Sequence, residues 1–459
     1  FQDQAGTIWI GTYKGLNKVD RSPSKFLHYQ NLPESPNSLS NNIVYDIQDC
    51  REGHLWIGTF DGLNRFDRVN EQFTVIRHIE NDPASISSNK IRTIVMDSAG
   101  YLWVGTENRG MNRINTRTGQ IRHYVHNDAD SNSILEDNIL SSYVDSQGRI
   151  WIGTVSRGVS ILDPESGKAF HLSDSPDSRV RLSDNKIWTI YEDRIGNFWL
   201  GTNQGLNKIS PGFKMLNVYR HDPLDESSIS TDRIFSVYQD EDGIYWIGTM
   251  GGGLNRFDPM TAKFVTYDEH DGLSNNVVYA TLDDGEGNLW LCTNWGISKF
   301  NKTSETFVNY DTKDGVQGNE FNIGAAYRNK KGEMFFGGMN GFNVFYPSEI
   351  TMNKVPPRIV FTGLRVMNDL LFTDLEDGQV IRLNYNESIF SVEFSGLDYT
   401  NPQKNQYRYK LENYDEDWIM ANAYQRRAEY RKVGPGYYRF IVTGSNNDGV
   451  WNEKGISLT

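Results

Sequence analysis

The sequence predicts an all-β protein, a seven-bladed β-propeller followed by an immunoglobulin/fibronectin-like β-sandwich. A motif of the form Trp-Ile-Gly-Thr followed by Gly-Leu-Asn recurs at intervals of 44 to 48 residues, and the first of its eight occurrences is partial. Repeats of this length are typical of small sheets that stack, because one sheet cannot bury both of its faces. The motif centres on Trp9, Trp56, Trp103, Trp151, Trp199, Trp246, Trp290 and Phe335.

Each repeat contains four short segments suited to β-strands. In the unit that begins at Asn41, these segments are residues 42–47, 55–59, 63–67 and 73–78, which are rich in β-branched and aromatic side chains. Four antiparallel strands per repeat are typical of a propeller blade. The Gly two positions after each Trp shares its strand face, where a missing side chain lets the next blade approach closely.

Counting strands predicts how the ring closes. Inner strands and fourth strands each occur seven times, and the last unit lacks a fourth strand of its own. We expect residues 25–29 to complete that unit and make seven blades; a ring of eight blades is the alternative. Residues 1–24 are then a remnant of an upstream blade, residues 25–350 the propeller, and residues 351–459 a sandwich truncated at its C-terminus.

Composition excludes some classes of partner. With 46 Lys and Arg against 59 Asp and Glu, the formal net charge is −13. This charge argues against nucleic acid as a partner and against attraction to an anionic membrane surface. No apolar run reaches the length of a membrane span. We expect a fragment whose only link to a membrane lies in segments outside this sequence; whether Cys50 and Cys292 pair is left open.

The sequence shows no sign of catalytic chemistry. It contains no Cys/His spacing of a zinc site, no nucleophile elbow and no phosphate-binding loop. Six of the eight His fall in or just after fourth strands, on the expected outer rim. Turns such as Asp97–Gly100 are interpreted as structural rather than as calcium loops. We therefore predict no catalytic residue, no metal and no cofactor, with a glycan-active enzyme as the less favoured alternative.

Ligand binding is expected on the loops at one end of the ring, since loops on a rigid scaffold carry function. The loops before the inner strands and those between second and third strands share that end. Positions that differ between repeats are the informative ones. An exposed indole can stack on a sugar ring, and Lys and Arg can donate to hydroxyl or acidic groups. The candidate ligand-binding residues are Lys90, Arg109, Arg157, Arg233 and Trp295.

These motifs also carry a family likeness. The repeats resemble two-component regulator propeller repeats, and the C-terminal segment resembles the Y_Y_Y sandwich that follows them. The second likeness rests on residues 407–411, Trp418, residues 435–437 and residues 445–451. Together the two cover essentially the whole chain. They imply the periplasmic sensor region of a bacterial membrane receptor, with two propellers, a sandwich, a membrane helix and a histidine kinase, often in a hybrid two-component system.

The resemblance sets the expected function. It implies the periplasmic portion of an inner-membrane protein that recognises an oligosaccharide or another small periplasmic ligand. The intact receptor is expected to be a homodimer in which the sandwich passes the signal to the membrane. The alternatives are the same sensor coupled to a diguanylate cyclase, and a propeller that serves as a protein-interaction platform.

Overall fold

The computed structural model describes residues 1–2, 6–19, 25–50, 53–367, 369–373, 375–384 and 387–459. The chain divides into two compact units. One is Ser24–Glu349, and the other combines Phe1–Pro23 with Ile350–Thr459. No helix among the described residues is long and apolar enough to cross a membrane.

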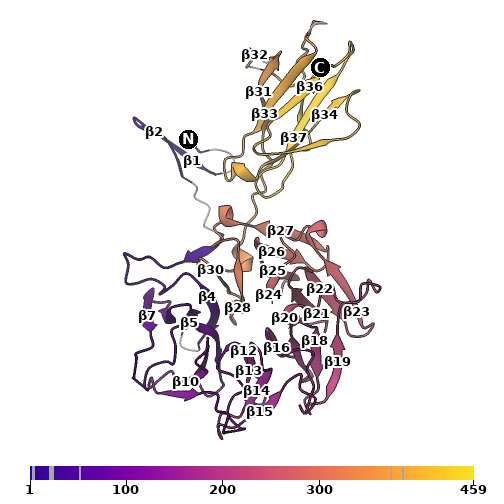
Figure 1. Cartoon of the computed structure of the whole chain (residues 1–459). Helices are drawn as coiled ribbons and strands as arrows, with labels where there is room; N and C mark the ends of the chain where they lie inside the picture. The colour runs from indigo at the N-terminus through magenta and orange to yellow at the C-terminus, as the bar shows by residue number, and fades with distance from the viewer. Residues whose placement is uncertain (3–5, 20–24, 51–52, 368, 374, 385–386) are drawn as a thin grey trace. The chain divides into compact units, whose positions relative to one another are not determined.

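Within the described residues, the unit Ser24–Glu349 consists of seven four-stranded antiparallel sheets, here called blades (Figure 1). Blade 1 consists of β4 (Val44–Asp49), β5 (His54–Thr59), β6 (Gly62–Asp67) and β7 (Gln72–Ile76), and blade 2 of β8 (Ile91–Met96), β9 (Tyr101–Thr106), β10 (Met111–Asn115) and β11 (Ile121–Tyr124). Blade 3 consists of β12 (Ile139–Val144), β13 (Ile150–Thr154), β14 (Val159–Leu162) and β15 (Ala169–Leu172). Blade 4 consists of β16 (Thr189–Glu192), β17 (Phe198–Gly201), β18 (Leu206–Ile209) and β19 (Met215–Tyr219). Blades 5 and 6 are β20 (Ile234–Gln239), β21 (Tyr245–Thr249), β22 (Leu254–Asp258) and β23 (Lys263–Tyr267); and β24 (Val278–Asp283), β25 (Asn288–Thr293), β26 (Gly296–Asn301) and β27 (Thr306–Tyr310). The closing blade is β28 (Phe321–Arg328), β29 (Met334–Gly338), β30 (Gly341–Phe345) and β3 (Leu27–Tyr29).

The blades form a closed ring. The inner strands β4, β8, β12, β16, β20, β24 and β28 are neighbours in that order, and β28 is again a neighbour of β4. The fourth strand of the closing blade comes from the start of the unit, because Leu27 pairs with Val344 and Tyr29 with Phe342. A segment that precedes blade 1 therefore completes the last sheet.

Glycines make the seams between blades tight, as the repeat predicts. A Cβ on Gly58 would lie 2.7 Å from the Ile91 side chain of the next blade, and one on Gly201 would lie 2.8 Å from the Ile234 carbonyl oxygen. Blade 6 has Cys292 at this position, and the next inner strand, β28, carries a register shift between Phe321 and Ala326. Both cysteines are free thiols, Cys50 half-buried and Cys292 buried.

The Asp-x-x-Gly turns have a structural function. The indole Nε1 of a buried Trp donates to the Asp six residues earlier, at 2.8 Å for Trp151 and Asp145 and at 3.0 Å for Trp199 and Asp193. A buried N–H needs such an acceptor. The same bond joins Trp103 to Asp97, Trp246 to Asp240 and Trp290 to Asp284.

The second unit contains a β-sandwich and a hairpin. One sheet is β32 (Asp369–Phe372), β31 (Ile359–Val366), β33 (Ile389–Gly396) and β36 (Arg427–Arg431), and the other is β35 (Ile419–Asn422), β34 (Gln406–Glu412), β37 (Arg439–Gly444) and β38 (Ile456–Leu458). Phe361, Phe394, Tyr407 and Phe440 are buried in the sandwich core. The hairpin is β1 (Ile8–Thr12) and β2 (Gly15–Val19), and its Trp9 ring lies 5.1 Å from the Tyr399 ring. Single turns of 3₁₀ helix occur at Glu269–Asp271, Thr312–Asp314, Pro347–Glu349 and Pro402–Lys404.

Candidate functional site

One end of the propeller, here called the loop end, is built from two interlocked sets of loops. The loop between the second and third strands of a blade donates a backbone N–H to the segment before the next inner strand. Gly62 N donates to Asn89 O at 2.7 Å, and Gly158 N donates to Asn185 O at 3.0 Å. Gly341 N donates to Asn42 O at 2.6 Å, which joins the closing blade to blade 1. The two loop sets therefore lie side by side.

The Asn of the Gly-Leu-Asn motif forms hydrogen bonds to the segment before the inner strand of its own blade. Asn64 is buried; its Oδ1 accepts from Ser40 N at 2.9 Å and its Nδ2 donates to Ser40 Oγ at 2.8 Å. Asn112 and Asn207 make the same bonds in blades 2 and 4. These Asn residues are part of the scaffold, which leaves recognition to the positions that vary.

Most inner strands carry a β-bulge just after their first residue, and a bulge re-aims the side chain of its extra residue. Register shifts occur in β4, β8, β12, β20 and β24. The extra residues are Tyr45, Arg92, Leu140, Phe235 and Tyr279. In blade 4 the corresponding residue is Trp188, which directly precedes β16.

Three of these side chains form an aromatic wall, defined here as Trp188, Phe235 and Tyr279. The Trp188 and Phe235 rings meet edge to face at 5.1 Å, and Phe235 stacks on Tyr279 at 5.9 Å with the planes 8° apart. Trp188 Nε1 donates to Asn203 Oδ1 at 2.7 Å, and the Tyr279 hydroxyl donates to Asn294 Oδ1 at 3.4 Å. Because both Asn lie in second-to-third-strand loops, the wall spans three blades at the loop end.

Three of the predicted ligand-binding residues adjoin these bulge positions. Trp295 is 58% exposed and directly follows Asn294, the acceptor of the Tyr279 hydroxyl. Arg233 is exposed and precedes Phe235 by two residues; its guanidinium lies 3.7 Å from Met250 Sδ.

Lys90 is partly engaged with its own surroundings. Its ammonium lies 4.7 Å from the centre of the Phe60 ring and 3.5 Å from the Glu107 carboxylate. It precedes Arg92 by two residues, and the Arg92 guanidinium lies 4.3 Å from the Tyr45 ring of blade 1. Blades 1 and 2 therefore present cations paired with aromatic faces. In blades 4 and 6 the half-buried Trp188 and Tyr279 flank Phe235, which is itself buried.

The other two predicted residues are placed differently. Arg157 is exposed, and its Nη1 lies 3.1 Å from His126 Nε2 and 3.3 Å from the Leu135 carbonyl oxygen. Hydrogen bonding to the Ile134 carbonyl, and then to Asp128, raises the pKa of His126. Arg157 thus belongs to the network that orders the loop before β12.

Arg109 is exposed in the loop between β9 and β10.

The aromatic wall was not predicted from the sequence, because ligand-binding residues were sought in the loops and the inner strands were interpreted as scaffold. The available signal was variation inside a strand. The position after the conserved-looking Ile or Val is Arg92, Leu140 or Trp188 in successive repeats, while the residues on either side change little.

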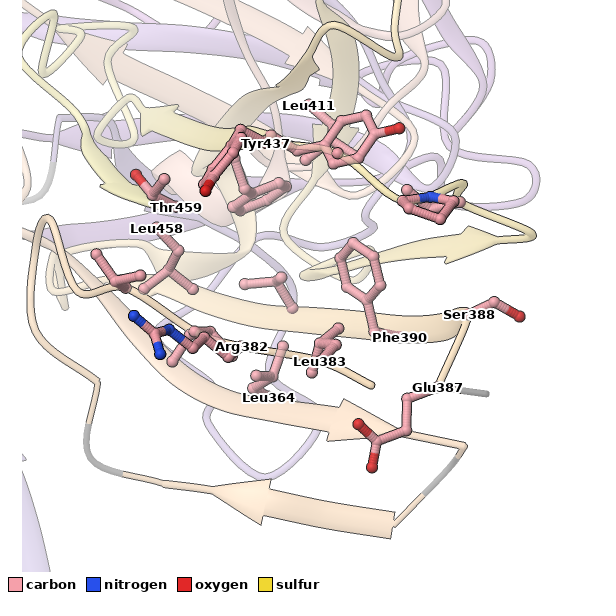
Figure 2. A pocket seen from close by; sticks show the side chains of 18 of the residues that line it. Leu364, Arg382, Leu383, Glu387, Ser388, Phe390, Leu411, Tyr437, Leu458 and Thr459 are labelled. Atoms are coloured by element: carbon pink, nitrogen blue, oxygen red, sulfur yellow. The ribbon is translucent and has the colours of Figure 1, made fainter. Parts of the chain in front are cut away.

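The sandwich contains a cavity of about 610 Å³. Figure 2 shows Leu364, Leu383 and Phe390 between the strands that line it, with the Glu387 carboxylate pointing away from them. Leu364 and Leu411 belong to the hydrophobic core of the sandwich, so the cavity is an opening into that core. Its lining also includes polar residues, among them Arg382, Asn384 and Ser388. Among the described residues, no group of three or more His, Cys, Asp or Glu could hold a metal ion.

A propeller with varied side chains at one end, followed by a β-sandwich, defines a recognition scaffold. Residues 85–108, 133–156, 181–204, 228–251 and 272–295 match the Two component regulator propeller family, and residues 398–459 match the Y_Y_Y domain family. The expected resemblance to these repeats and to this domain is confirmed.

Solved structures support the same class. An extracellular domain assigned to a hybrid two component system of B. thetaiotaomicron is 28% identical with a TM-score of 0.84, over 100% of this chain and 60% of that chain. A second such domain from the same organism shows the same fold at 24% identity and a TM-score of 0.59, over 100% of this chain and 61% of that one.

Among curated proteins, Histidine kinase P4 of Formosa agariphila is 29% identical over 195 residues. The match covers 40% of this chain and 14% of that protein, so this chain corresponds to a small part of its relative. Taken together, these findings show that the chain is similar to the extracellular domains of hybrid two-component systems, with which it shares the propeller repeats and the Y_Y_Y domain.

Proposed function

We propose that this domain binds an oligosaccharide in the periplasm, at the loop end of the propeller, as the sensor of an inner-membrane histidine kinase. The observation that supports this proposal is the aromatic wall together with its cations. The Lys186 ammonium lies 4.3 Å from the Trp188 ring, and Arg233 lies two residues from Phe235. Aromatic faces can stack on the apolar face of a sugar ring, while ammonium and guanidinium groups donate to hydroxyl or carboxylate oxygens.

The domain acts by binding and not by turnover. A ligand shifts an equilibrium between two receptor states only through its different affinity for them. In the intact receptor, a homodimer, binding at the propeller favours one arrangement, and the sandwich conveys it to the membrane-spanning segments. Coupling to a diguanylate cyclase instead of a kinase would leave this sensing step unchanged.

The test uses two tetrasaccharides that differ in charge, a neutral galactotetraose and an acidic tetragalacturonate. A ligand that binds only the folded state raises the midpoint of thermal unfolding. We expect one of the two to stabilise the chain, and the effect to weaken at least tenfold in calorimetric affinity on Trp188→Ala or Trp295→Ala. Arg157→Ala is the matched control, because Arg157 bonds to the loop around His126.

Three results would contradict the proposal. Stabilisation that survives both Trp substitutions would place the sugar elsewhere on the molecule. Release of shorter saccharides during the incubation, followed by chromatography, would support the alternative of a glycan-active enzyme. Absence of any stabilisation by either tetrasaccharide, with binding of a protein partner to the same face, would favour an interaction platform.

A further inference from the structure

A second cavity lies between blades 1 and 2, at the turns that join inner to second strands. These turns are at the opposite end of the sheets from the loop end. Its volume is about 150 Å³. Cys50, His54, Trp56 and Arg65 line it from blade 1, and Arg117 lines it from blade 2. Since a water molecule occupies about 30 Å³ in the liquid, the cavity has room for a small ion.

Cys50 takes the position that Asp holds in blades 2 to 6, six residues before the Trp of the motif. In blade 3, Asp145 shows what that carboxylate does. Its Oδ1 accepts from Arg149 N at 2.9 Å, and its Oδ2 accepts from Trp151 Nε1 at 2.8 Å. Blade 1 keeps the Trp but has no carboxylate at this position.

Donors in blade 1 are left without their acceptor. Trp56 is 4% exposed, and within the described part of the chain its indole N–H makes no hydrogen bond. His54 Nδ1 is also buried without a partner among the described residues. A buried polar atom that lacks a partner, as His54 Nδ1 does, costs about 1–3 kcal/mol. The carboxylate that the other Trp-containing blades use is missing here, and a group bound in the cavity can take its place.

The closing blade shows how the same loss can be compensated. There Asn329 replaces the Asp, and Phe335 replaces the Trp, so no indole N–H has to be satisfied. The Glu333 carboxylate lies beside this Asn and accepts from its Nδ2 at 2.9 Å. In blade 1 only the acceptor has changed, which is why the need for an anion is confined to this blade.

The charged residues around the cavity also favour an anion as its ligand. None of the described residues that line it is acidic, although the chain as a whole carries a net charge of −13. Arg65 pairs in register with Trp56, as Lys208 pairs with Trp199. The Lys208 ammonium lies 4.7 Å from its Trp ring, whereas Arg65 lines the cavity.

The Asp49 carboxylate does not replace the Asp that is missing at position 50. Asp49, next to Cys50, interacts with the charges of Arg68 and Glu333 at the seam with the closing blade and is not part of the cavity lining. From these observations we propose that the cavity binds a small carboxylate ion, such as acetate, in the place of the missing Asp carboxylate. The ion accepts from the Trp56 indole and is held by Arg65 and Arg117.

The test compares the full 459-residue chain in sodium acetate and in sodium chloride at equal ionic strength, since chloride has no carboxylate oxygens to replace those of the missing Asp. We expect about 100 mM acetate to raise the midpoint of thermal unfolding by about 2 °C. The Trp56 indole resonance, assigned by Trp56→Phe, should shift with saturation. Equal midpoints together with an unmoved resonance would show a cavity that holds only water, and would overturn the proposal.

Matched variants make the test specific. Cys50→Asp provides a carboxylate from the chain itself, so we expect a higher midpoint without acetate and no further response to acetate. Cys50→Ser leaves the cavity open and should respond as the unmodified chain does. If Cys50→Asp does not fold, Arg65→Met serves in its place and should weaken the apparent acetate affinity several-fold. A response that persists unchanged in Cys50→Asp or Arg65→Met would overturn the proposal.

Discussion

The closing blade and blade 4 reach the same four-stranded form by different means. In blade 4 the strands β16 to β19 follow one another directly along the chain, and the buried Trp199 donates to Asp193. In the closing blade, β3 arrives from the start of the unit, and Phe335 replaces the Trp. An ion pair between Arg68 of blade 1 and the buried Glu333 joins the closing blade to its neighbour.

Aromatic packing adds to the closing seam. Tyr29 of β3 stacks on Phe342 at 5.0 Å and also contacts Phe66 of blade 1 at 5.0 Å. Contacts between segments so far apart in the chain form only after a large loop has closed, which carries an entropic cost. A blade whose four strands are consecutive in the chain, such as blade 4, is therefore stabilised by the hydrogen bond between its own turn Asp and its Trp. The closing blade is stabilised by side chains that contact blade 1. We expect the ring to open first at this seam.

Removing β3 should have the largest effect. Deletion of residues 1–30 removes Tyr29 and Phe26, of which Phe26 is 1% exposed, and leaves the edge of β30 unpaired. We expect the propeller to lose about 5 kcal/mol or more in free energy of unfolding, since one core Phe alone is worth about 3–5 kcal/mol. Urea unfolding followed by Trp fluorescence measures the loss. Deletion of residues 1–19 removes only the hairpin and is the control; equal losses would contradict the comparison.

The seam between blades 1 and 2 should respond to pH. Burial raises the pKa of Asp46 to about 7, against hydrogen bonds from Ile94 N, Thr93 Oγ1 and Ile47 N that lower it. Because the folded pKa is above the ordinary value near 4, folding takes up a proton between these two values. The contribution of Asp46 to stability is therefore largest below pH 4 and is lost as pH rises through 7, by up to about 4 kcal/mol.

This pH dependence can be isolated by substitution. The free energy of unfolding of Asp46→Ser, measured by urea at pH 5 and at pH 8, should differ from that of the unmodified chain more at pH 5 than at pH 8. A difference that does not change with pH would show that the ionisation of Asp46 is not linked to folding.

Breaking the ion pair of the closing seam should cost less. Glu333→Ala leaves the Arg68 guanidinium without its carboxylate and removes the acceptor of Asn329. We expect a loss of about 2–3 kcal/mol, below the largest values for buried pairs because the Arg68 side chain is 29% exposed. A double-mutant cycle with Arg68→Met measures the coupling by urea unfolding. Additive losses would mean that the pair does not hold the seam.

Overpacking one continuous seam should give the smallest of these effects. A Cβ on Gly105 would lie 2.6 Å from the Thr93 side chain and 2.8 Å from that of Ile139, so Gly105→Ala should destabilise the propeller by about 1–3 kcal/mol. Gly11 holds the same motif position in the N-terminal hairpin, where a Cβ would meet nothing within 4 Å. Gly11→Ala should therefore leave thermal unfolding unchanged. A comparable shift in both variants would contradict the account of the glycines.

Much of this architecture could be predicted from the sequence because repeat position and structural function coincide. The Trp-x-Gly spacing predicted the tight seams, and the missing fourth strand predicted that residues 25–29 pair near the end of the unit. The use of Glu333 and Arg68 at the closing seam could not be foreseen. Neither residue occupies a motif position, and their contact depends on the ring being closed.

The candidate binding residues were harder to choose because loop membership alone does not say where a side chain points. Arg157 has the right residue type in the right loop, yet its guanidinium bonds to His126 in the loop before β12 of its own blade. Trp188 and Tyr279 come from segments that look like scaffold in the sequence. The register shift at Tyr279 in β24 and the position of Trp188 directly before β16 set these two side chains apart from the regular strand ladder.

The bulges bear on how such receptors diversify. A bulged residue stands outside the ladder of backbone hydrogen bonds, so its side chain can be exchanged while strand pairing and blade spacing stay the same. One position in each of five blades is thus available for exchange, with little risk to folding. A combinatorial library restricted to these few positions would be the natural starting point for building biosensors of new specificity on this scaffold.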